Sequence, residues 1–227
     1  MALGPFQVAE RLSQGKRERG IALLMRHGET AWNREGRVMG RQPVDLDQGG
    51  REQVLRAVAL ARTLAPDLIV SSPLPRAVQS AEIIAQGIGG IEIITDDRLE
   101  EVRYGDWEGK TYRQLIVDES YINYRKAPME SVTPGGETIA QVQARGVAAV
   151  DAAVTEHRGK RVLFVSHGDI IRTVMCHYMR LDLHHFHRLR VDNATFFGIE
   201  ISDEFAEVKF LNLLPDPDRA FRSPFKK

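Results

Sequence analysis

Two stretches of the chain share one design, and together they constrain the fold more than any other feature. Each opens with an apolar run: Ile21–Gly28 ends in Arg-His-Gly, and Val162–Gly168 ends in Ser-His-Gly. Short apolar runs that end in polar residues and glycine indicate strands buried in a parallel sheet. Because ligands of open α/β sheets bind beyond the carboxyl ends of the strands, His27 and His167 are predicted to meet at that edge.

A third stretch brings a second arginine to the same edge. Residues 69–76 read as an apolar strand, a turn with serine and proline, and Arg76 at the start of a predicted helix. Arg26 already precedes His27 at the end of its strand. Arginine presents a planar fork of donors that matches phosphate. Two arginines and two histidines at one sheet edge therefore predict a site for a dianion.

Along the rest of the chain, apolar residues alternate between strand-like and helix-like spacing. Strands are predicted at residues 21–25, 68–71, 91–95, 162–165, 195–201 and 207–213. Helices are predicted at residues 51–65, 76–86, 111–126, 137–157 and 170–179, and a polar loop at residues 29–50. Strands that alternate with helices predict an α/β fold, here a three-layer α/β/α sandwich with a mainly parallel central sheet.

The length of 227 residues fits one α/β domain with insertions. We expect a single domain over residues 21–214, a polar N-terminal arm at residues 1–20 and a C-terminal tail at residues 215–227. Within the domain, residues 105–136 are a candidate insertion or cap over the site.

Composition narrows the class of partner. Lys and Arg together number 31, as do Asp and Glu, so the formal net charge is zero. This balance argues against a nucleic acid or a membrane surface as the main partner. Cys176 is the single cysteine, which excludes a disulfide framework and a cysteine-based zinc site. No apolar run approaches membrane-spanning length and residues 1–20 lack the apolar core of a secretory signal, so we expect a cytoplasmic location.

The residue types at the predicted edge suit phosphoryl transfer. A neutral histidine nitrogen is a nucleophile toward phosphorus, and it divides hydrolysis into two easier steps. Fixed positive donors must match the charge on the transferring phosphoryl oxygens, and Arg26, Arg76 and His167 are the candidates. The leaving oxygen also needs a proton from an acid. The acid candidates are Glu101 and Glu100, followed by Asp106 and Glu108. Spacing alone does not choose between them.

Taken together, these segments resemble the histidine phosphatase superfamily, which has the phosphoglycerate mutase-like fold. The resemblance covers most of residues 21–201, and its motifs occur in the family's order. They are Arg26 to Thr30, Asn33, Ser71 to Ala81 with Arg76, Leu99 to Gly109, Pro134 to Glu137 and Ser166 to Gly168. Each motif is modest by itself, but the common order is specific.

The resemblance implies a role for each matched residue. His27 corresponds to the histidine that carries the phosphoryl group, and Glu101 to the acid that protonates the leaving group and then activates water. The implied catalytic set is His27, Glu101, His167, Arg26 and Arg76. The implied substrate-binding set is Arg26, Gly28, Thr30, Asn33, Arg76 and His167. No metal or other cofactor is implied, because the arginines and the second histidine supply the positive charge.

The run Gly105–Gly109 is similar to the phosphatase branch of the family, whereas the bisphosphoglycerate-dependent mutases carry a histidine-containing motif and a longer insertion there. We therefore expect a metal-independent phosphomonoester hydrolase that acts through phosphohistidine on a small phosphorylated metabolite. A phosphoglycerate mutase and a non-catalytic phosphate-ligand binding protein are the alternatives. The sequence does not decide the physiological substrate or the oligomeric state, and a homodimer is one of the states that it allows.

Some residues depart from the family pattern. Pro43, Asp45 and Asp47 stand where Asp, Pro and Thr are common, and Glu100 stands where Arg is frequent beside the acid. These departures concern substrate contacts rather than the catalytic set. A separate cluster of histidines comprises His184, His185 and His187. A metal site there would need a second set of ligands, which the sequence does not offer, so surface histidines are expected.

Overall fold

Six strands form one sheet at the centre of the computed structural model, which describes residues 20–215. The strands are β1 (Gly20–Arg26), β2 (Leu68–Ser71), β3 (Ile93–Thr95), β4 (Arg161–Ser166), β5 (Phe196–Ile201) and β6 (Ala206–Leu213). Their order across the sheet is β3-β2-β4-β1-β5-β6. The first four strands of this order are parallel, and β5 runs antiparallel to both of its neighbours. The predicted α/β fold with a mainly parallel sheet is confirmed.

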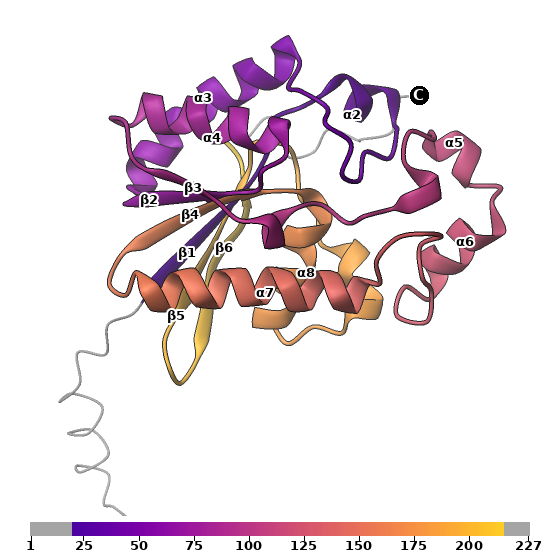
Figure 1. Cartoon of the computed structure of the whole chain (residues 1–227). Coiled ribbons are helices and arrows are strands. Elements are labelled where there is room, and N and C mark those ends of the chain that lie inside the picture. The colour runs from indigo at the N-terminus through magenta and orange to yellow at the C-terminus, as the bar shows by residue number, and fades with distance from the viewer. Residues whose placement is uncertain (1–19, 216–227) are drawn as a thin grey trace, which may run out of the picture.

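Helices cover both faces of the sheet. The long helices are α3 (Gln48–Leu64), α4 (Pro75–Gly87), α7 (Ile139–Glu156) and α8 (Gly168–Tyr178). The short helices and 3-10 turns are α2 (Ala31–Glu35), α5 (Tyr112–Leu115), α6 (Glu119–Lys126), η1 (Asp97–Leu99), η2 (Gly105–Trp107) and η3 (Leu183–Arg188). Helices α3 and α4 pack on one face, and α7 and α8 pack on the other (Figure 1). These are the three predicted layers.

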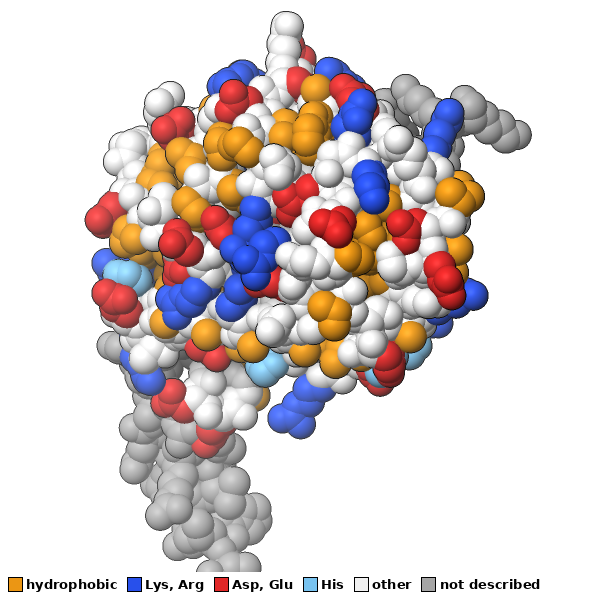
Figure 2. All heavy atoms as spheres, turned by 45° about the vertical axis from the view of Figure 1, so that its right-hand side comes forward, with side chains coloured by type: hydrophobic (Ala, Val, Ile, Leu, Met, Phe, Trp, Pro, Cys, Tyr) orange, Lys and Arg blue, Asp and Glu red, His pale blue; other side chains and the backbone are white. Residues whose placement is uncertain are grey.

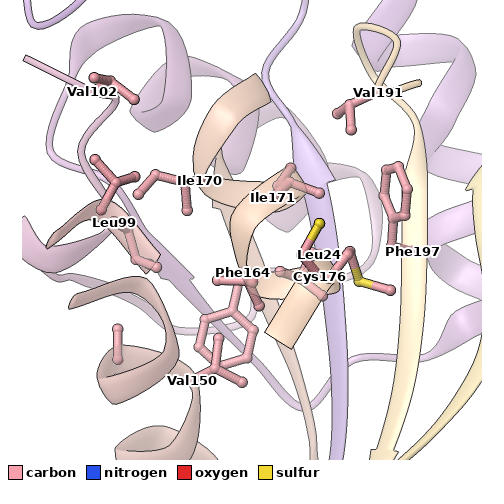
Figure 3. Packing of buried hydrophobic residues seen from close by; sticks show 14 of the residues in the cluster. Leu24, Leu99, Val102, Val150, Phe164, Ile170, Ile171, Cys176, Val191 and Phe197 are labelled. Carbon is pink, nitrogen blue, oxygen red and sulfur yellow. The ribbon is translucent and has the colours of Figure 1, made fainter. Parts of the chain in front are cut away.

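Alternation along the strands produces a separate core on each face. In β1, Ala22 and Leu24 belong to the core under α7 and α8, and Leu23 and Met25 belong to the core under α3 and α4. Successive side chains of a strand point to opposite faces, so a strand covered on both faces is apolar throughout. Figure 3 shows Phe164 of β4 in the first of these cores, among side chains of α7 and α8. Each such large side chain contributes about 1.5–3 kcal/mol through burial.

Side-chain caps explain two corrected helix boundaries. Helix α3 begins at Gln48 rather than at residue 51, because the Asp47 carboxylate accepts a hydrogen bond from the Gly50 amide at 2.7 Å. Helix α7 begins at Ile139 rather than at residue 137, because Thr138 is its N-cap. In both cases the predicted apolar spacing is right and the boundary is wrong.

Two predicted segments have a different internal structure. The predicted helix over residues 111–126 is two helices, because Asp118 caps a new helix, α6, through the amides of Ser120 and Tyr121. The predicted polar loop at residues 29–50 contains α2 as well as the start of α3. The predicted strand at residues 91–95 pairs with β2 only over its last three residues.

Residues 105–136 leave the sheet and form η2, α5 and α6, which lie at the right of Figure 1. Trp107 is 1% exposed and packs edge-on against Tyr121 and Tyr124, with ring centroids 5.4 and 5.3 Å apart. That this segment acts as a cap stays a prediction, as does the single domain over residues 21–214. Apart from residues 20 and 215, the predicted arm and tail lie outside the described residues. Among the described helices, none is both long and apolar enough to cross a bilayer.

Candidate active site

Strand register places the two predicted histidines side by side. Strands β1 and β4 end level with each other, with Arg26 opposite Ser166. The next residue of each strand is a histidine, and the ring centroids of His27 and His167 lie 5.2 Å apart. Strand β2, on the other side of β4, brings Ser72 to the same edge. The structure therefore brings together the two histidines as the sequence predicts.

His27 is buried and holds one tautomer. Its Nδ1 lies 2.6 Å from the carbonyl oxygen of Gly28. A carbonyl oxygen can only accept, so in the neutral ring Nδ1 carries the proton and Nε2 carries none. Burial, followed by the charges of Arg76 and Arg26, lowers the pKa of His27 well below its ordinary value. At neutral pH the ring is uncharged, and its Nε2 can act as a nucleophile.

Arg26 and Arg76 bring two guanidinium groups to these histidines. Arg76 is fully buried, and its two Nη atoms donate to the backbone oxygens of Gln42 at 2.9 Å and Gly40 at 2.7 Å. Arg26 donates to the backbone oxygen of Val191 at 2.8 Å. Burial is the main cause that lowers the pKa of both arginines, that of Arg76 to about 10. Arg76 therefore remains charged at neutral pH, and hydrogen bonds to backbone oxygens hold both guanidinium groups in fixed orientations.

His167 links the end of β4 to the start of α8. Its Nε2 lies 2.7 Å from the hydroxyl oxygen of Ser72, and its ring is fully buried. Burial, and then the charge of Arg76, lowers the pKa of His167 well below its ordinary value. With Ser72 on one ring nitrogen, the other nitrogen is the one left for a ligand.

Three buried nitrogens of this group have no hydrogen-bond partner within residues 20–215. They are Nε of Arg26, Nε of Arg76 and Nδ1 of His167. An unpaired buried polar group costs about 1–3 kcal/mol, and native proteins leave few of them. An anion with several acceptor oxygens, such as a phosphoryl group, can accept from the two arginine nitrogens, and from Nδ1 of His167 in the tautomer that protonates it. The arrangement is therefore suited to bind an anion.

Glu101 places a carboxyl group in the field of both arginines. Its Oε1 accepts from the amide of Val102 at 3.0 Å, and its Oε2 faces the amide of Asp169 at 3.5 Å. Burial, and then the negative charge of Asp169, raises the pKa of Glu101, although Arg76 and Arg26 act in the opposite direction. The surroundings therefore favour the acid form of this carboxyl group.

The other three acid candidates have different surroundings. Glu100 forms an ion pair with Arg41 at 2.9 Å. Glu108 accepts a hydrogen bond from the backbone amide of Arg41 at 3.3 Å. Asp106 is exposed. Tertiary contacts thus separate Glu101 from its neighbours, a distinction that sequence spacing does not make.

A network of ion pairs holds the backbone that carries Glu101. Glu137 pairs with Arg145 at 3.0 Å and with Arg41 at 3.1 Å. Arg145 also donates to the carbonyl oxygen of Glu101 at 3.1 Å. The sequence analysis places Pro134–Glu137 among the family motifs without a role. In the structure this motif ends in the carboxylate that positions the segment of the acid.

Gly28, Thr30 and Asn33 make local structural contacts. A Cβ atom at Gly28 would lie 2.5 Å from the backbone oxygen of Gly50, so glycine lets β1 end close against α3. The Gly28 amide donates to the Ser80 hydroxyl at 3.1 Å. Thr30 and Asn33 form the capping box of α2. The predicted contact of these three residues with a substrate stays a prediction.

Asp169, Arg172 and Tyr104 surround the acid, and the sequence analysis does not single them out. Asp169 is 7% exposed, and its carboxylate accepts hydrogen bonds from the Tyr104 hydroxyl and the Arg172 guanidinium. Arg172 also donates through Nε to the backbone oxygen of Leu189 at 2.9 Å. The available signal was position, since an acidic residue stands two places after His167 and directly before the predicted helix.

The three histidines of the cluster His184, His185 and His187 differ in their exposure to solvent. His184 is exposed and lies between Asp182 and Glu130, at 2.7 and 2.8 Å, and His185 is also exposed. His187 is partly buried, so the expected surface position is wrong for this residue. Within residues 20–215, no three His, Cys, Asp or Glu side chains are grouped to hold a metal ion.

The surface around the segment 105–136 carries both signs of charge. Figure 2 brings this side of the molecule forward and shows Lys and Arg side chains interspersed with Asp, Glu and apolar side chains. The unpaired nitrogens of Arg26, Arg76 and His167, in contrast, are buried. Fold and site together define an α/β protein that gathers two arginine and two histidine side chains at one edge of its sheet.

Comparison with known proteins identifies the family to which the chain belongs. The model of the histidine phosphatase superfamily (branch 1) matches residues 22–214. A probable phosphoglycerate mutase of Escherichia coli, GpmB, is 32% identical over 184 residues, which cover 79% of this chain and 84% of that protein. The chain belongs to the histidine phosphatase superfamily, as the sequence motifs indicated.

Solved structures share the fold over nearly their whole length. YhfR of Bacillus stearothermophilus has a TM-score of 0.81 at 31% identity, and the match covers 86% of this chain and 98% of that one. A mycobacterial glucosyl-3-phosphoglycerate phosphatase, solved with VO3, has a TM-score of 0.77 at 27% identity, with 86% and 99% covered. The prediction of a phosphatase-class enzyme of this superfamily is confirmed.

Proposed function

We propose that this chain is a metal-independent phosphomonoester hydrolase that acts through a phosphohistidine intermediate on a small phosphorylated metabolite. The observation that carries the proposal is the set of unpaired buried donors on Arg26, Arg76 and His167, beside the unprotonated Nε2 of His27. A nucleophile and the donors for a phosphoryl group then occupy one pocket.

In the first step, Nε2 of His27 attacks the phosphorus atom, and the bond from phosphorus to the leaving oxygen breaks. Arg26, Arg76 and His167 stabilise the charge on the phosphoryl oxygens as the bond breaks. The acid form of Glu101 gives its proton to the leaving oxygen, so the product departs as an alcohol. The result is phospho-His27 and an ionised Glu101.

In the second step, water replaces the alcohol. The Glu101 carboxylate accepts a proton from a water molecule, whose oxygen attacks the phosphorus of phospho-His27. The bond from phosphorus to nitrogen breaks, His27 recovers its lone pair, and inorganic phosphate is released with Glu101 again in the acid form. Fixed arginines supply the positive charge that magnesium supplies in other phosphoryl-transfer enzymes, which is why the proposed reaction needs no metal.

Phosphoglycerate mutase action is the second candidate, because the relative from Escherichia coli carries that name. The same phosphoenzyme would then pass its phosphoryl group to another hydroxyl group instead of to water. The name of the mycobacterial neighbour supports hydrolysis. The two reactions differ in the fate of phospho-His27, and a non-catalytic binding protein would form no phosphoenzyme at all.

Phosphate release from para-nitrophenyl phosphate and from a panel of metabolite monoesters, with a chelator present, tests the proposal. Wild type is compared with His27→Ala and with His185→Ala, a matched control at an exposed histidine. We expect release that survives the chelator, persists in His185→Ala and disappears in His27→Ala.

Three other outcomes would contradict the proposal. Unchanged release in His27→Ala would exclude His27 as the nucleophile. Interconversion of 3-phosphoglycerate with a bisphosphate primer, without net phosphate release, would establish the mutase. Binding of the panel compounds without any turnover would establish the binding protein.

A further inference from the structure

The half-buried Glu101 contacts the buried Asp169 in the field of Arg26 and Arg76. Oε2 of Glu101 lies 3.5 Å from the backbone nitrogen of Asp169, whose own side chain is 7% exposed. The negative charge of the Asp169 side chain disfavours an ionised Glu101 and, after burial, raises its pKa. One member of the pair is therefore favoured as a neutral acid.

Hydrogen-bond partners decide which carboxyl group keeps its charge. Asp169 accepts from the Arg172 guanidinium and the Tyr104 hydroxyl. Against the effect of burial, the charge of Arg172 lowers the pKa of Asp169. Within residues 20–215, the hydrogen-bond donors to the Glu101 carboxyl group are backbone amides, those of Val102 and Asp169. Asp169 is therefore the ionised member of the pair.

We propose that Asp169 is a positioning residue that keeps Glu101 in the acid form needed to protonate the leaving group. Its backbone amide orients Oε2 of Glu101, and its fixed negative charge disfavours a second charge beside it. Asp169 acts through Glu101 and does not itself touch the phosphoryl group. This inference rests on the proposed hydrolase function, because it concerns the acid of that reaction.

Other titratable groups around Glu101 do not replace this effect. The groups that interact with its carboxyl group are Arg26 of β1, Arg76 of α4, Tyr104, Tyr124 of α6, and Asp169 and Arg172 of α8. Arg41 and Arg145 donate to its backbone oxygen. The strand-end histidines are His27 and His167. The two strand-edge arginines favour the carboxylate form. The tyrosines are uncharged, because burial raises their pKa values well above the ordinary value. The histidines are neutral. Asp169 is the negative charge that opposes the arginines.

The same carboxylate restrains Arg172. A Cβ atom placed on Gly168 would lie 3.5 Å from Nη1 of Arg172 and 3.7 Å from Nε of Arg26, so the two guanidinium groups flank this glycine. If Asp169 loses its charge, Arg172 becomes an unmatched cation close to Arg26. That cation would also favour the ionised form of Glu101. Asp169→Asn therefore lowers the pKa of Glu101 by both routes.

A carboxyl ¹³C NMR titration of Glu101 tests the inference without any turnover. The resonance is identified by its absence in Glu101→Gln, and the variants compared are Asp169→Asn and Asp151→Asn. Asp151 is a matched control, because it also accepts from a tyrosine hydroxyl, that of Tyr178 at 2.6 Å, but lies exposed on α7. We expect the titration of Glu101 to move to lower pH in Asp169→Asn and to stay unchanged in Asp151→Asn.

An unchanged Glu101 titration in a folded Asp169→Asn protein would overturn the inference. The wild type provides a second test that does not depend on the variant's folding. Glu101 must titrate above the ordinary glutamate value while Asp169 titrates below the ordinary aspartate value. A wild-type Glu101 that titrates at or below its ordinary value would also overturn the inference.

Kinetics separates this role from a purely structural one. For alkyl phosphates, the alkaline limb of kcat/KM should move to lower pH in Asp169→Asn, with a loss at the wild-type optimum of up to about 100-fold. Turnover of para-nitrophenyl phosphate, whose leaving group needs no proton, should change little. Equal losses for both substrates with an unmoved limb would overturn the inference. If the wild type releases no phosphate, the proposed hydrolase fails, and the NMR titration still decides the state of Glu101.

Discussion

Two regions of the molecule are held in place in different ways. One is the phosphate end, formed by Arg26, His27, Arg76 and His167, and the other is the segment 105–136. At the phosphate end, His27 and His167 follow strands whose register is set by ladder hydrogen bonds, and Arg76 is fixed by backbone carbonyl oxygens. In the segment 105–136, short helices begin at their own side-chain caps and pack through aromatic rings. A one-residue slip of register would turn every side chain of a strand to the other face, whereas short helices depend on local caps.

This difference separates the part of the site that every substrate would contact from the part whose contacts would depend on the substrate. In the proposed hydrolase, the strand ends hold the groups that would meet the phosphoryl group, which all phosphomonoesters share. The segment 105–136 contributes Tyr124, whose hydroxyl interacts with Glu101, and it directly follows Tyr104, which donates to Asp169. In the proposed reaction the leaving group departs on this side. Changes at the strand ends should therefore affect all substrates alike, and changes near the acid or the aromatic group should separate one substrate from another.

The largest effect is expected for His27→Ala. Loss of the nucleophile removes the covalent route, so turnover of every substrate should fall by about 10⁴-fold or more. Rapid quench with ³²P-labelled substrate should show an acid-labile phosphoenzyme in the wild type and none in the variant. A labelled His27→Ala protein would place the phosphoryl group on another residue.

Arg76→Lys should have the next largest effect. Lysine keeps the charge but lacks the fork that contacts Gly40, Gln42 and the phosphoryl group together, so kcat/KM should fall about 10²–10³-fold for aryl and alkyl esters alike. Arg62→Lys is the matched control, since exposed Arg62 also donates to a backbone oxygen, that of Gly87 at 2.6 Å. If kcat/KM falls by different factors for aryl and alkyl esters, Arg76 is not a contact that all substrates share.

Glu101→Gln should sort substrates by leaving group. Alkyl phosphates need a proton on the leaving oxygen and should slow by about 10²–10⁴-fold, while aryl phosphates should slow far less. Because the pKa of Glu101 is raised, the wild-type profile for alkyl esters should lose activity as pH rises above the ordinary glutamate range, and this limb should vanish in the variant. A selective loss in Glu100→Gln instead would identify the neighbouring residue as the acid.

Tyr124→Phe should have the smallest effect and act on stability more than on turnover. The Tyr124 hydroxyl is buried and interacts with the Tyr104 side chain, but it makes no hydrogen bond of ordinary geometry within residues 20–215. Its removal should therefore leave the free energy of unfolding unchanged or raise it by about 1 kcal/mol. Tyr178→Phe, which removes the bond to Asp151, should instead lower the free energy of unfolding by about 1 kcal/mol. Urea unfolding of both variants and turnover of para-nitrophenyl phosphate, which should not change, provide the comparison.

Much of the fold was predictable because it depends on local pattern. The apolar runs of β1, β2 and β4 are buried on both faces, and such strands carry no alternation that could be misread. The boundaries of α3 and α7 and the break before α6 depended on caps by Asp47, Thr138 and Asp118, which apolar spacing does not register. The capping residues are visible in the sequence, but the sequence does not tell whether a cap or the apolar spacing decides where a helix begins.

For the site, the sequence by itself determined the residue types and their order: a histidine after each of two strands, an arginine beside one of them and a second arginine after a third strand. That information suffices because strands of one parallel sheet must end at a common edge. Only the tertiary structure decided that Glu101 faces this edge while Glu100 pairs with Arg41, and that Asp169 lies against the acid. The physical reason is that proton affinity depends on burial and on charges brought close in space, and both arise from segments far apart in the chain.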